Sequence, residues 1–458
     1  MEALVPKNHI LRKIDAVLDL SFAREAVAEC YSASLGRPSV DPELALRMLL
    51  LGRMYDLSGR RLCDEIGMHV GMRWFCGLNL HDPVPDHSTL SKLKNERWVE
   101  SGLFERLFDR VVRQCSDAGL VSGRHLSGDG TQVRADASMQ SLEAMIEAVK
   151  PADESGDPPD DSGPGVAEAA PPKPLEVVSG EAKEPQPRGG WKGHGVKYSN
   201  QTHRSTNDPD ARLYRKGKGK EAKPSYLMHD LIDTKSRVIL SRKVSEAHSS
   251  AERKVCIEML DEVLAKREEL GLPNRPEVIS LDGGYGTGEM AAALLDREVL
   301  PHMPLQAGPA MEPVPEWKRP TYNLQKRRGR NEKVRQVRAR NRVRELQKTR
   351  GYRVSRSLRT RSEHTFAEAK VVHGMDRARV RGTARVQVQA TITGAVQNLK
   401  RLAAYRGRRR PAGANALSSG PAGSVSRPRG ASDRPQPRSF ARRSSNLPVS
   451  ISRRPARH

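Results

Sequence analysis

The stretch RTRSEHTFAEAKVVHGMDRARVRG, residues 359–382, carries the charges around which the rest of the chain is organised. In a helix that turns by about 100° per residue, Arg359, Glu363 and Lys370 fall within about 40° of one another. One carboxylate then lies between two cations, where it could hold a metal ion while the cations contact phosphates. Glu368 points to the opposite side. For this segment alone, a solvated helix with i,i+4 ion pairs is the better explanation.

Two upstream segments each present one aspartate at the end of an apolar run. HLSGDGTQVRADAS (125–138) alternates like a strand and contains Asp129, and PEVISLDGGYGTG (276–288) contains a short buried strand that ends at Asp282. Two such aspartates and a helix carboxylate suit one or two Mg²⁺ ions, because this hard cation takes oxygen ligands. Two ions roughly 3.5–4 Å apart would activate the attacking oxygen and stabilise the leaving one in a phosphodiester displacement.

Each aspartate also has a purely structural explanation. Asp129 precedes a glycine, as turn residues often do, and Asp282 precedes Gly-Gly and could cap the next helix. The glycines after Asp282 would let backbone approach a substrate, although such runs are common after strands. Other acids that spacing alone does not exclude are Asp136, Asp208, Asp210, Asp230 and Glu368.

The order of the predicted elements indicates an α/β fold. Residues 1–117 are predicted to be all helical, with one helix starting at Pro42 after Asp41. There follow a strand with Asp129, a hairpin over 225–244, a helix, a strand ending in Asp282, a helix, a strand and helices. We therefore predict a mixed sheet flanked by helices behind an all-α amino-terminal domain.

Composition divides the chain further. We predict a helical DNA-binding or dimerisation domain over 1–117 and a catalytic domain over 118–403. Residues 151–188 contain nine prolines and nine acids, which predicts a disordered acidic insertion at 150–190. Residues 404–458 are rich in Arg, Pro, Ser and Gly and are predicted to be a disordered tail.

The net charge of +24, from 79 Lys and Arg against 55 Asp and Glu, points to a polyanionic partner, with nucleic acid ahead of an anionic membrane. Half of the excess comes from residues 406–458, which hold 13 arginines and one acid. Lys92 and Lys94 lie on a short capped helix that suits a helix-turn-helix-like DNA contact. A helical bundle used for packing or dimerisation explains this region equally well.

Several classes of protein are not indicated. The longest apolar run, residues 45–51, is interrupted by Arg47 and is too short to span a bilayer. The amino-terminal residues lack the pattern of a secretory signal, so a cytoplasmic protein is predicted. The five cysteines include no C-x-x-C pair, which fits free thiols and indicates neither a disulfide framework nor a zinc site.

The motifs, taken together and in order, resemble those of DDE-class transposases from bacterial insertion sequences. The resemblance covers roughly residues 35–402, without the acidic insertion and the tail. In the helical region it is carried by VDPELALRMLLLG, LSGRRLCDEIG, MRWFCGL and DPVPDHSTLSKLK. Beyond it the motifs are GDGTQVRADAS, HRSTNDPDARLYRKGKGKEAK, LDGGYG, SEHTFAEAKVVHGMDRARVRG and QNLKRL.

The resemblance implies an RNase H-like catalytic core. Asp129, Asp282 and Glu363 would be the catalytic residues and would hold two Mg²⁺ ions, or Mn²⁺ in their place. Arg359 and Lys370 stand at the spacing of the family signature, which selects Glu363 as its glutamate and assigns both cations to DNA phosphates near the scissile bond.

One position departs from the signature, which has a tyrosine three residues before the arginine. This chain has Arg356 there, and its nearest tyrosine is Tyr352. The departure leaves a tyrosine contact with the DNA end in doubt, whereas the metal ligands are unaffected.

The resemblance further implies cut-and-paste transposition. The protein would bind double-stranded DNA at terminal inverted repeats as a homodimer or higher assembly, associated with the nucleoid. Water would free a 3′-hydroxyl, which would attack target DNA. A basic run, 326–350, would follow the DNA backbone, starting with Lys326, Arg327 and Arg328. Two alternatives stay open: a non-catalytic DNA-binding protein derived from a transposase, and a metal nuclease that only cuts.

Overall fold

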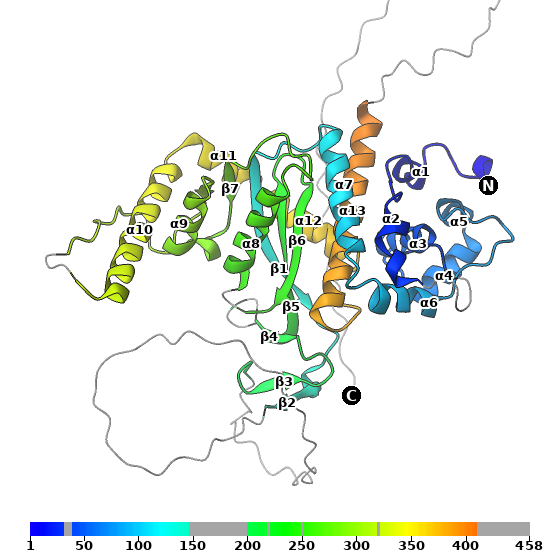
Figure 1. Cartoon of the computed structure of the whole chain (residues 1–458), viewed down its shortest axis with the longest axis horizontal. Helices are drawn as coiled ribbons and strands as arrows, with labels where there is room; N and C mark the ends of the chain where they lie inside the picture. Colours follow the sequence, from blue (N-terminus) through cyan, green and yellow to red (C-terminus); the bar gives the residue numbers. More distant parts are fainter. Residues whose placement is uncertain are drawn as a thin grey trace, which may run out of the picture. The chain divides into compact units, whose positions relative to one another are not determined.

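The long strand β1 lies in the middle of a six-stranded mixed sheet (Figure 1). It pairs antiparallel with β5 and parallel with β7, while β6 and β4 pair with β5 and β8 continues the parallel side. The strands of this sheet are β1 (His125–Arg134), β4 (Arg212–Tyr214), β5 (Lys223–Asp233), β6 (Ile239–Glu246), β7 (Val278–Ser280) and β8 (Leu300–His302). This sheet of one antiparallel and one parallel half confirms the predicted RNase H-like arrangement.

The computed structural model describes residues 1–31, 39–145, 199–215, 217, 220–248, 251–317 and 321–409. The acidic insertion predicted at 150–190 lies outside these residues, as does the tail from residue 410 onward. A second, two-stranded sheet pairs β2 (Leu142–Ala144) with β3 (His203–Ser205). The predicted hairpin is β5–β6, and Asp233 Oδ2 accepts a hydrogen bond from Ser236 N at 2.9 Å in its turn.

The residues before β1 are helical, as predicted. The α-helices here are α1 (Ile10–Asp15), α2 (Ala23–Ala26), α3 (Pro42–Met54), α4 (Gly59–Met68), α5 (Val70–Phe75), α6 (His87–Lys92) and α7 (Leu103–Asp117). Short 3₁₀ segments occupy η1 (Glu2–Leu4) and η2 (Ala28–Cys30), and a π-helical turn, η3 (Leu93–Arg97), extends α6. Helix α3 begins at Pro42, as predicted, because proline fits the first position of a helix.

Six further helices accompany the sheet: α8 (Ala251–Ala265), α9 (Gly288–Asp296), α10 (Leu324–Gln347), α11 (Arg350–Leu358), α12 (Thr360–Val371) and α13 (Thr383–Arg409). Two 3₁₀ segments, η4 (Met139–Ser141) and η5 (Gly283–Tyr285), complete the described part. Helix α13 runs past residue 404, where we predicted the tail to begin. It continues because Leu402 and Ala403 are buried and Tyr405 still donates a hydrogen bond to Gly119 O at 3.2 Å.

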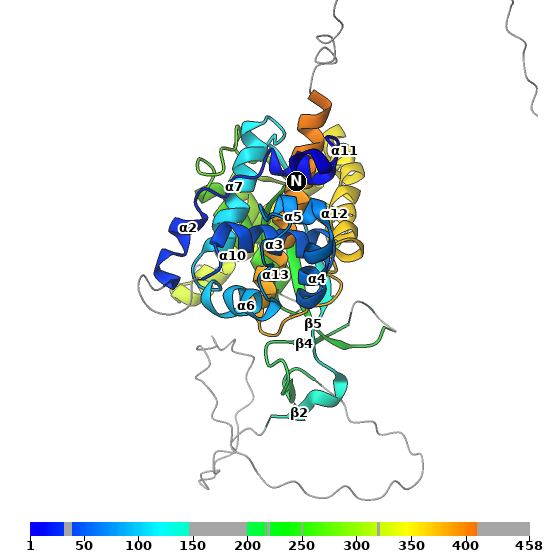
Figure 2. The ribbon, with the colours of Figure 1, turned by 90° about the vertical axis from the view of Figure 1, so that its right-hand side faces the viewer.

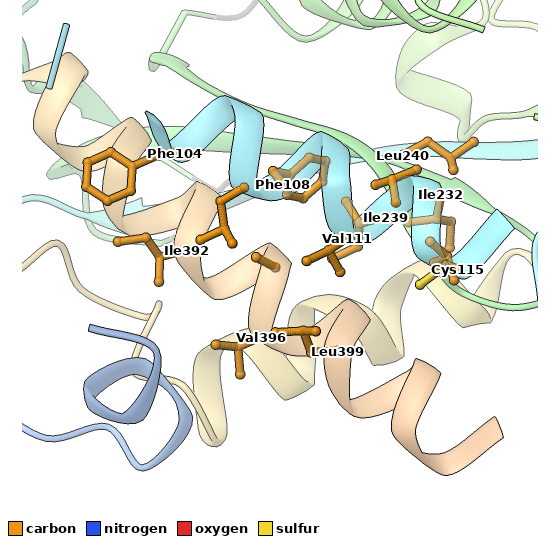
Figure 3. Packing of buried hydrophobic residues seen from close by; sticks show 14 of the residues in the cluster. Phe104, Phe108, Val111, Cys115, Ile232, Ile239, Leu240, Ile392, Val396 and Leu399 are labelled. Atoms are coloured by element: carbon orange, nitrogen blue, oxygen red, sulfur yellow. The ribbon is translucent and has the colours of Figure 1, made fainter. Parts of the chain in front are cut away.

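Helices α7 and α13 pack along each other and join the helical region to the sheet (Figure 3). The buried side chains between them and β6 include Phe104, Phe108, Val111, Ile239, Leu240, Ile392, Val396 and Leu399. The helices come so close that a Cβ at Gly394 of α13 would lie 2.8 Å from Phe108 Cε2. Helix α3 also contacts α13 (Figure 2), so the amino-terminal helices and the sheet share one hydrophobic core.

Packing within the chain requires two of the glycines after Asp282. A Cβ at Gly286 would lie 2.0 Å from Pro304 O, and one at Gly288 would lie 2.9 Å from Gln336 Cβ of α10. The chain therefore needs glycine at both positions to bring its own loop and helix together.

Candidate active site

Neighbouring strands β1 and β7 bring the two predicted aspartates to the same level of the sheet. Asp282 follows the end of β7, as predicted, whereas Asp129 lies within β1 and not at a turn, because the strand continues to Arg134. Ser127 of β1 is in register with Ser280 of β7, and Asp129 and Asp282 each follow two residues later. Because the two strands are parallel neighbours, both aspartates lie just beyond the last residues that pair β1 with β7, a position at which α/β sheets commonly bind ligands. The charge of Asp282 contributes to the raised pKa of Asp129, after burial.

The negative charge of the Asp129 carboxylate is only partly neutralised by the groups around it. Its side chain is 15% exposed, and its Oδ2 lies 3.7 Å from Arg359 Nη1 and accepts a hydrogen bond from Ser362 Oγ at 3.4 Å. Burial raises the pKa of Asp129 to about 6, and Asp282 adds to this rise, whereas the N–H of Gly130 and the guanidinium of Arg359 oppose it. A cation beyond Arg359 would stabilise the charged form.

Asp282 has a structural role as well. Its Oδ1 accepts a hydrogen bond from Gly284 N at 2.8 Å and so caps η5. The next α-helix is instead capped by Thr287, whose hydroxyl accepts from Met290 N at 3.2 Å. The capping prediction is therefore right for the 3₁₀ segment and wrong for α9. One carboxylate has two oxygens, so a capping bond at Oδ1 is compatible with metal binding.

Arg359 bridges the other two acids of the predicted site. Its Nη2 donates to Glu363 Oε1 at 3.1 Å, and its Nη1 faces Asp129. The i,i+4 ion pair suggested by the sequence is thus present, but the same guanidinium also reaches β1. The Glu363 side chain is 55% exposed. Over the ranges that the structure describes, no three His, Cys, Asp or Glu side chains converge on a single ion position.

Lys370 lies on the β1 side of α12, as the helical-face argument predicts. Its Nζ donates to Gln132 O of β1 at 2.6 Å, three residues beyond Asp129. Glu368 lies on the other side and accepts bonds from Lys400 and Arg401 of α13, at 2.7 and 2.9 Å. The structure thus separates the two glutamates of α12 as the sequence predicts.

The other acids that spacing could not exclude have structural partners elsewhere. Asp230 binds Arg242, Asp208 accepts from Tyr226 Oη at 2.6 Å, and Asp210 accepts from Thr383 N at 2.9 Å. Asp136 pairs with Arg377 and Arg381, at 2.8 and 3.2 Å. These four acids organise β5, β6 and the start of α13.

Glu252 of α8 is an acid near the site that the sequence analysis missed. Burial raises the pKa of Glu252, and the charges of Asp282 and Asp129 raise it further. A Cβ on Gly130 would lie 3.4 Å from Glu252 Oε1 and 3.2 Å from His229 Nδ1, so Gly130 leaves room for both. Local spacing held no signal for this neighbour, because α8 reaches β1 through the tertiary fold.

The predicted DNA-contacting cations lie in different surroundings. Lys326, Arg327 and Arg328 are exposed in the first turns of α10, and Lys92 is exposed on α6. Lys94 is half-buried in η3, near Arg53 and Arg379. Contact with DNA stays a prediction for all of them.

Two family models match the chain. The transposase domain DUF772 matches residues 1–96, and the transposase DDE domain matches residues 181–399, so that together they span most of the sequence. Asp282 and Glu363 fall within the second match, and Asp129 lies between the two. Both models describe domains of transposases. The chain belongs to the DDE transposases, which cleave DNA and transfer the cut strand.

Two solved structures are also similar to part of the chain. One is a Mos1 transposase paired-end complex with the left transposon end, with 10% identity and a TM-score of 0.17, covering 69% of this chain and 79% of that one. The other is a pre-cleavage Mos1 transpososome, with 9% identity and a TM-score of 0.18, covering 71% and 81%. No curated protein matches the sequence.

The oxygen donors around Asp129 fit a divalent cation. Asp129, Asp282 and Glu252 offer only carboxylate oxygens, which hard cations such as Mg²⁺ and Mn²⁺ prefer. Burial raises the pKa of Asp129 and of Glu252, and the negative charges of the neighbouring acids raise both further. DDE transposase domains depend on divalent metal, and this donor set agrees with that dependence.

None of the helices that the structure describes is long and apolar enough to cross a membrane.

Proposed function

We propose that this transposase cuts double-stranded DNA at the terminal inverted repeats of an insertion sequence and joins the freed 3′ ends to target DNA. The observation that carries the proposal is the position of Asp129 and Asp282 at one level of adjacent parallel strands, with the guanidinium of Arg359 3.7 Å from Asp129. The proposal includes binding of the repeats by a dimer or higher assembly of the chain.

Asp129 and Asp282 would hold the metal, with Glu363 as the third carboxylate. Bound Mg²⁺ or Mn²⁺ would supply Lewis-acid activation of water and stabilisation of the leaving oxygen. Arg359 would contribute a guanidinium to the phosphate at the scissile bond. A phosphate is a stronger partner for it than a half-exposed carboxylate, so binding of DNA would release Glu363 toward the aspartates.

The other cations would position the DNA. Lys370 already fixes α12 against β1 through Gln132 O, and we propose that it also contacts a phosphate near the cleavage site. The exposed start of α10, with Lys326, Arg327 and Arg328, would follow the backbone of the flanking duplex.

A cleavage and strand-transfer assay tests the proposal. The full chain is incubated with Mg²⁺ or Mn²⁺ and DNA that carries its own element ends. Metal-dependent nicks at the element boundary are expected, followed by joined products. Nicks without joined products would indicate a nuclease, and binding without nicks would indicate a DNA-binding protein derived from a transposase.

Replacing Glu252 tests whether the α8 acid takes part in holding the metal. Glu252→Gln is expected to weaken Mn²⁺ binding by about tenfold and to slow cleavage by about 10–100-fold, as for residues that support metal ligands. Its matched control is Glu258→Gln, an acid on the solvent side of the same helix. Isothermal titration with Mn²⁺ provides a measurement independent of activity. Equal Mn²⁺ affinity in both variants would rule Glu252 out of the site.

Removal of the basic tail is expected to affect binding and not chemistry. Deleting residues 410–458 removes ten arginines and one acid. Non-specific DNA affinity should fall, and its dependence on salt should become shallower, because fewer counterions are released. End cleavage at low salt should be unchanged. A chain with a neutral tail of equal length serves as the control, and loss of cleavage in the truncated protein would contradict the prediction.

A further inference from the structure

A cavity of about 390 Å³ lies among the amino-terminal helices, α13 and the segment that precedes it. Its wall comes from α3, α4, α6 and η3 on one side, and from Arg379, Val380 and α13 on the other. Figure 2 shows α3, α4 and α6 grouped with α13. The cavity is separate from Asp129 and Asp282, because neither is among its lining residues.

Besides Arg60 at the start of α4, three cations line this cavity. Arg53 comes from α3, Lys94 from η3 and Arg379 from the segment between α12 and α13. Arg379 Nη2 donates to Asp56 Oδ1 at 2.6 Å. Among the residues described, neither Arg53 nor Lys94 forms a salt bridge with a carboxylate, and Arg53 Nη1 is buried without a hydrogen-bond partner. One acid thus faces three cations.

The electrostatics show that this positive charge is not balanced. Burial, together with the charges of Arg53 and Arg379, lowers the pKa of Lys94 to about 8. Burial, together with Arg379, lowers the pKa of Arg53 to about 10, against the opposing effect of Asp56. Buried charges without partners are unfavourable unless an ion compensates them.

The cavity also receives the amino terminus of a helix. Ser58, Gly59 and Arg60, which start α4, line it, and the side chain of Ser58 makes no capping hydrogen bond. Free N–H groups in the first turn and the helix dipole favour an anion at this end. The cations and the helix terminus therefore both favour an anionic ligand in this cavity.

We propose that this cavity binds a phosphate group between Arg53, Lys94, Arg379 and the amino terminus of α4. The phosphate would join the amino-terminal helices to the segment that follows the Glu363 helix. Its source would be a phosphodiester of DNA or free phosphate, and only the DNA source rests on the proposed function. Lys94, predicted from the sequence as a DNA contact, would act inside the cavity and not on an open helix face.

Inorganic phosphate tests the site without DNA. The melting temperature of the full chain is measured against phosphate concentration at constant ionic strength. Phosphate should raise it for the wild type, and Lys94→Met should weaken the apparent affinity at least about tenfold. Lys13→Met, which removes an exposed lysine of α1, should behave like the wild type. No phosphate effect in the wild type, or an equal effect in both variants, would overturn the proposal.

A second experiment, with duplex DNA, identifies the source of the phosphate. Affinity for a random duplex is measured at several salt concentrations for the same three proteins. If the ligand is a DNA phosphate, Lys94→Met should reduce the salt slope by about one, and free phosphate should compete with the duplex. An unchanged slope together with the lost phosphate response would identify free phosphate as the ligand. Because the phosphate arm involves no cleavage, its result is independent of the proposed reaction.

Discussion

Asp129→Asn is expected to abolish DNA cleavage and, at the same time, to make the protein more stable above pH 6. Asparagine has nearly the same shape but lacks the charge that a divalent cation needs. Loss of a metal-binding carboxylate should lower the cleavage rate by on the order of 10³-fold or more, with DNA binding retained. The measurement is the rate of nicking at the element boundary.

The gain in stability follows from the raised pKa of Asp129. Its pKa is about 6 in the folded chain against 3.8 for an unperturbed aspartate, so the folded state binds the proton more tightly. Folding stability therefore falls as pH rises from about 4 to 6, and the penalty is complete above pH 6. At 1.36 kcal/mol per pKa unit, Asp129→Asn should raise the free energy of unfolding by about 2–3 kcal/mol at pH 7.5 without metal.

The pH dependence and a second aspartate supply the controls. At pH 3.5 the variant and the wild type should be equally stable, because Asp129 is then protonated in both states. Asp136→Asn changes an acid that pairs with Arg377 and Arg381, so it should not raise stability at any pH. If Asp129→Asn melts earlier than the wild type and still cleaves DNA, Asp129 has only a structural role in β1 and the proposed site is wrong.

Asp230→Asn is expected to destabilise the protein by about 3–5 kcal/mol, the usual effect of leaving one partner of a buried ion pair alone. The two carboxylate oxygens of Asp230 each accept a hydrogen bond from Arg242, at 2.6 Å, and both side chains are fully buried. Without the carboxylate, the guanidinium of Arg242 would stay buried in the sheet, with Ala390 O as a distant acceptor at 3.4 Å. Denaturant unfolding measures the loss.

Two comparisons separate charge burial from simple loss of a contact. Asp261→Asn breaks another bidentate ion pair, with Arg297. Because the Asp261 side chain is 49% exposed, the loss of unfolding free energy should stay below about 1 kcal/mol. The double change Asp230→Leu with Arg242→Met should recover most of the stability, because it leaves no unpaired charge. Equal losses for Asp230→Asn and Asp261→Asn would contradict the argument.

Local sequence patterns predict the parts of the site that depend on one element. The spacing within α12 places Arg359, Glu363 and Lys370 toward β1, and Glu368 away from it, as observed. The family resemblance then identified the metal-binding acids, a role that the structure leaves as a prediction.

The spacing of residues within one segment does not predict contacts between elements that are distant in the sequence. Glu252 comes near Asp129 only because α8 crosses β1, and Arg53 meets Arg379 only because α3 packs against α13. Asp230 illustrates the same limit, since its partner Arg242 is set by the register of β5 and β6. Such neighbours depend on strand register and helix packing, which the residue pattern of a single segment does not contain.

The pairing of α7 with α13 also bears on how the chain is synthesised. Cys115 of α7 and Asn398 of α13 are in contact although 283 residues separate them, and Asn398 also bonds both the N–H and the C=O of Ile239 in β6. A chain emerging from the ribosome therefore carries amino-terminal helices with an uncovered apolar face until α13 has been made. A chain that stops short of α13 would expose this face and would be prone to aggregate.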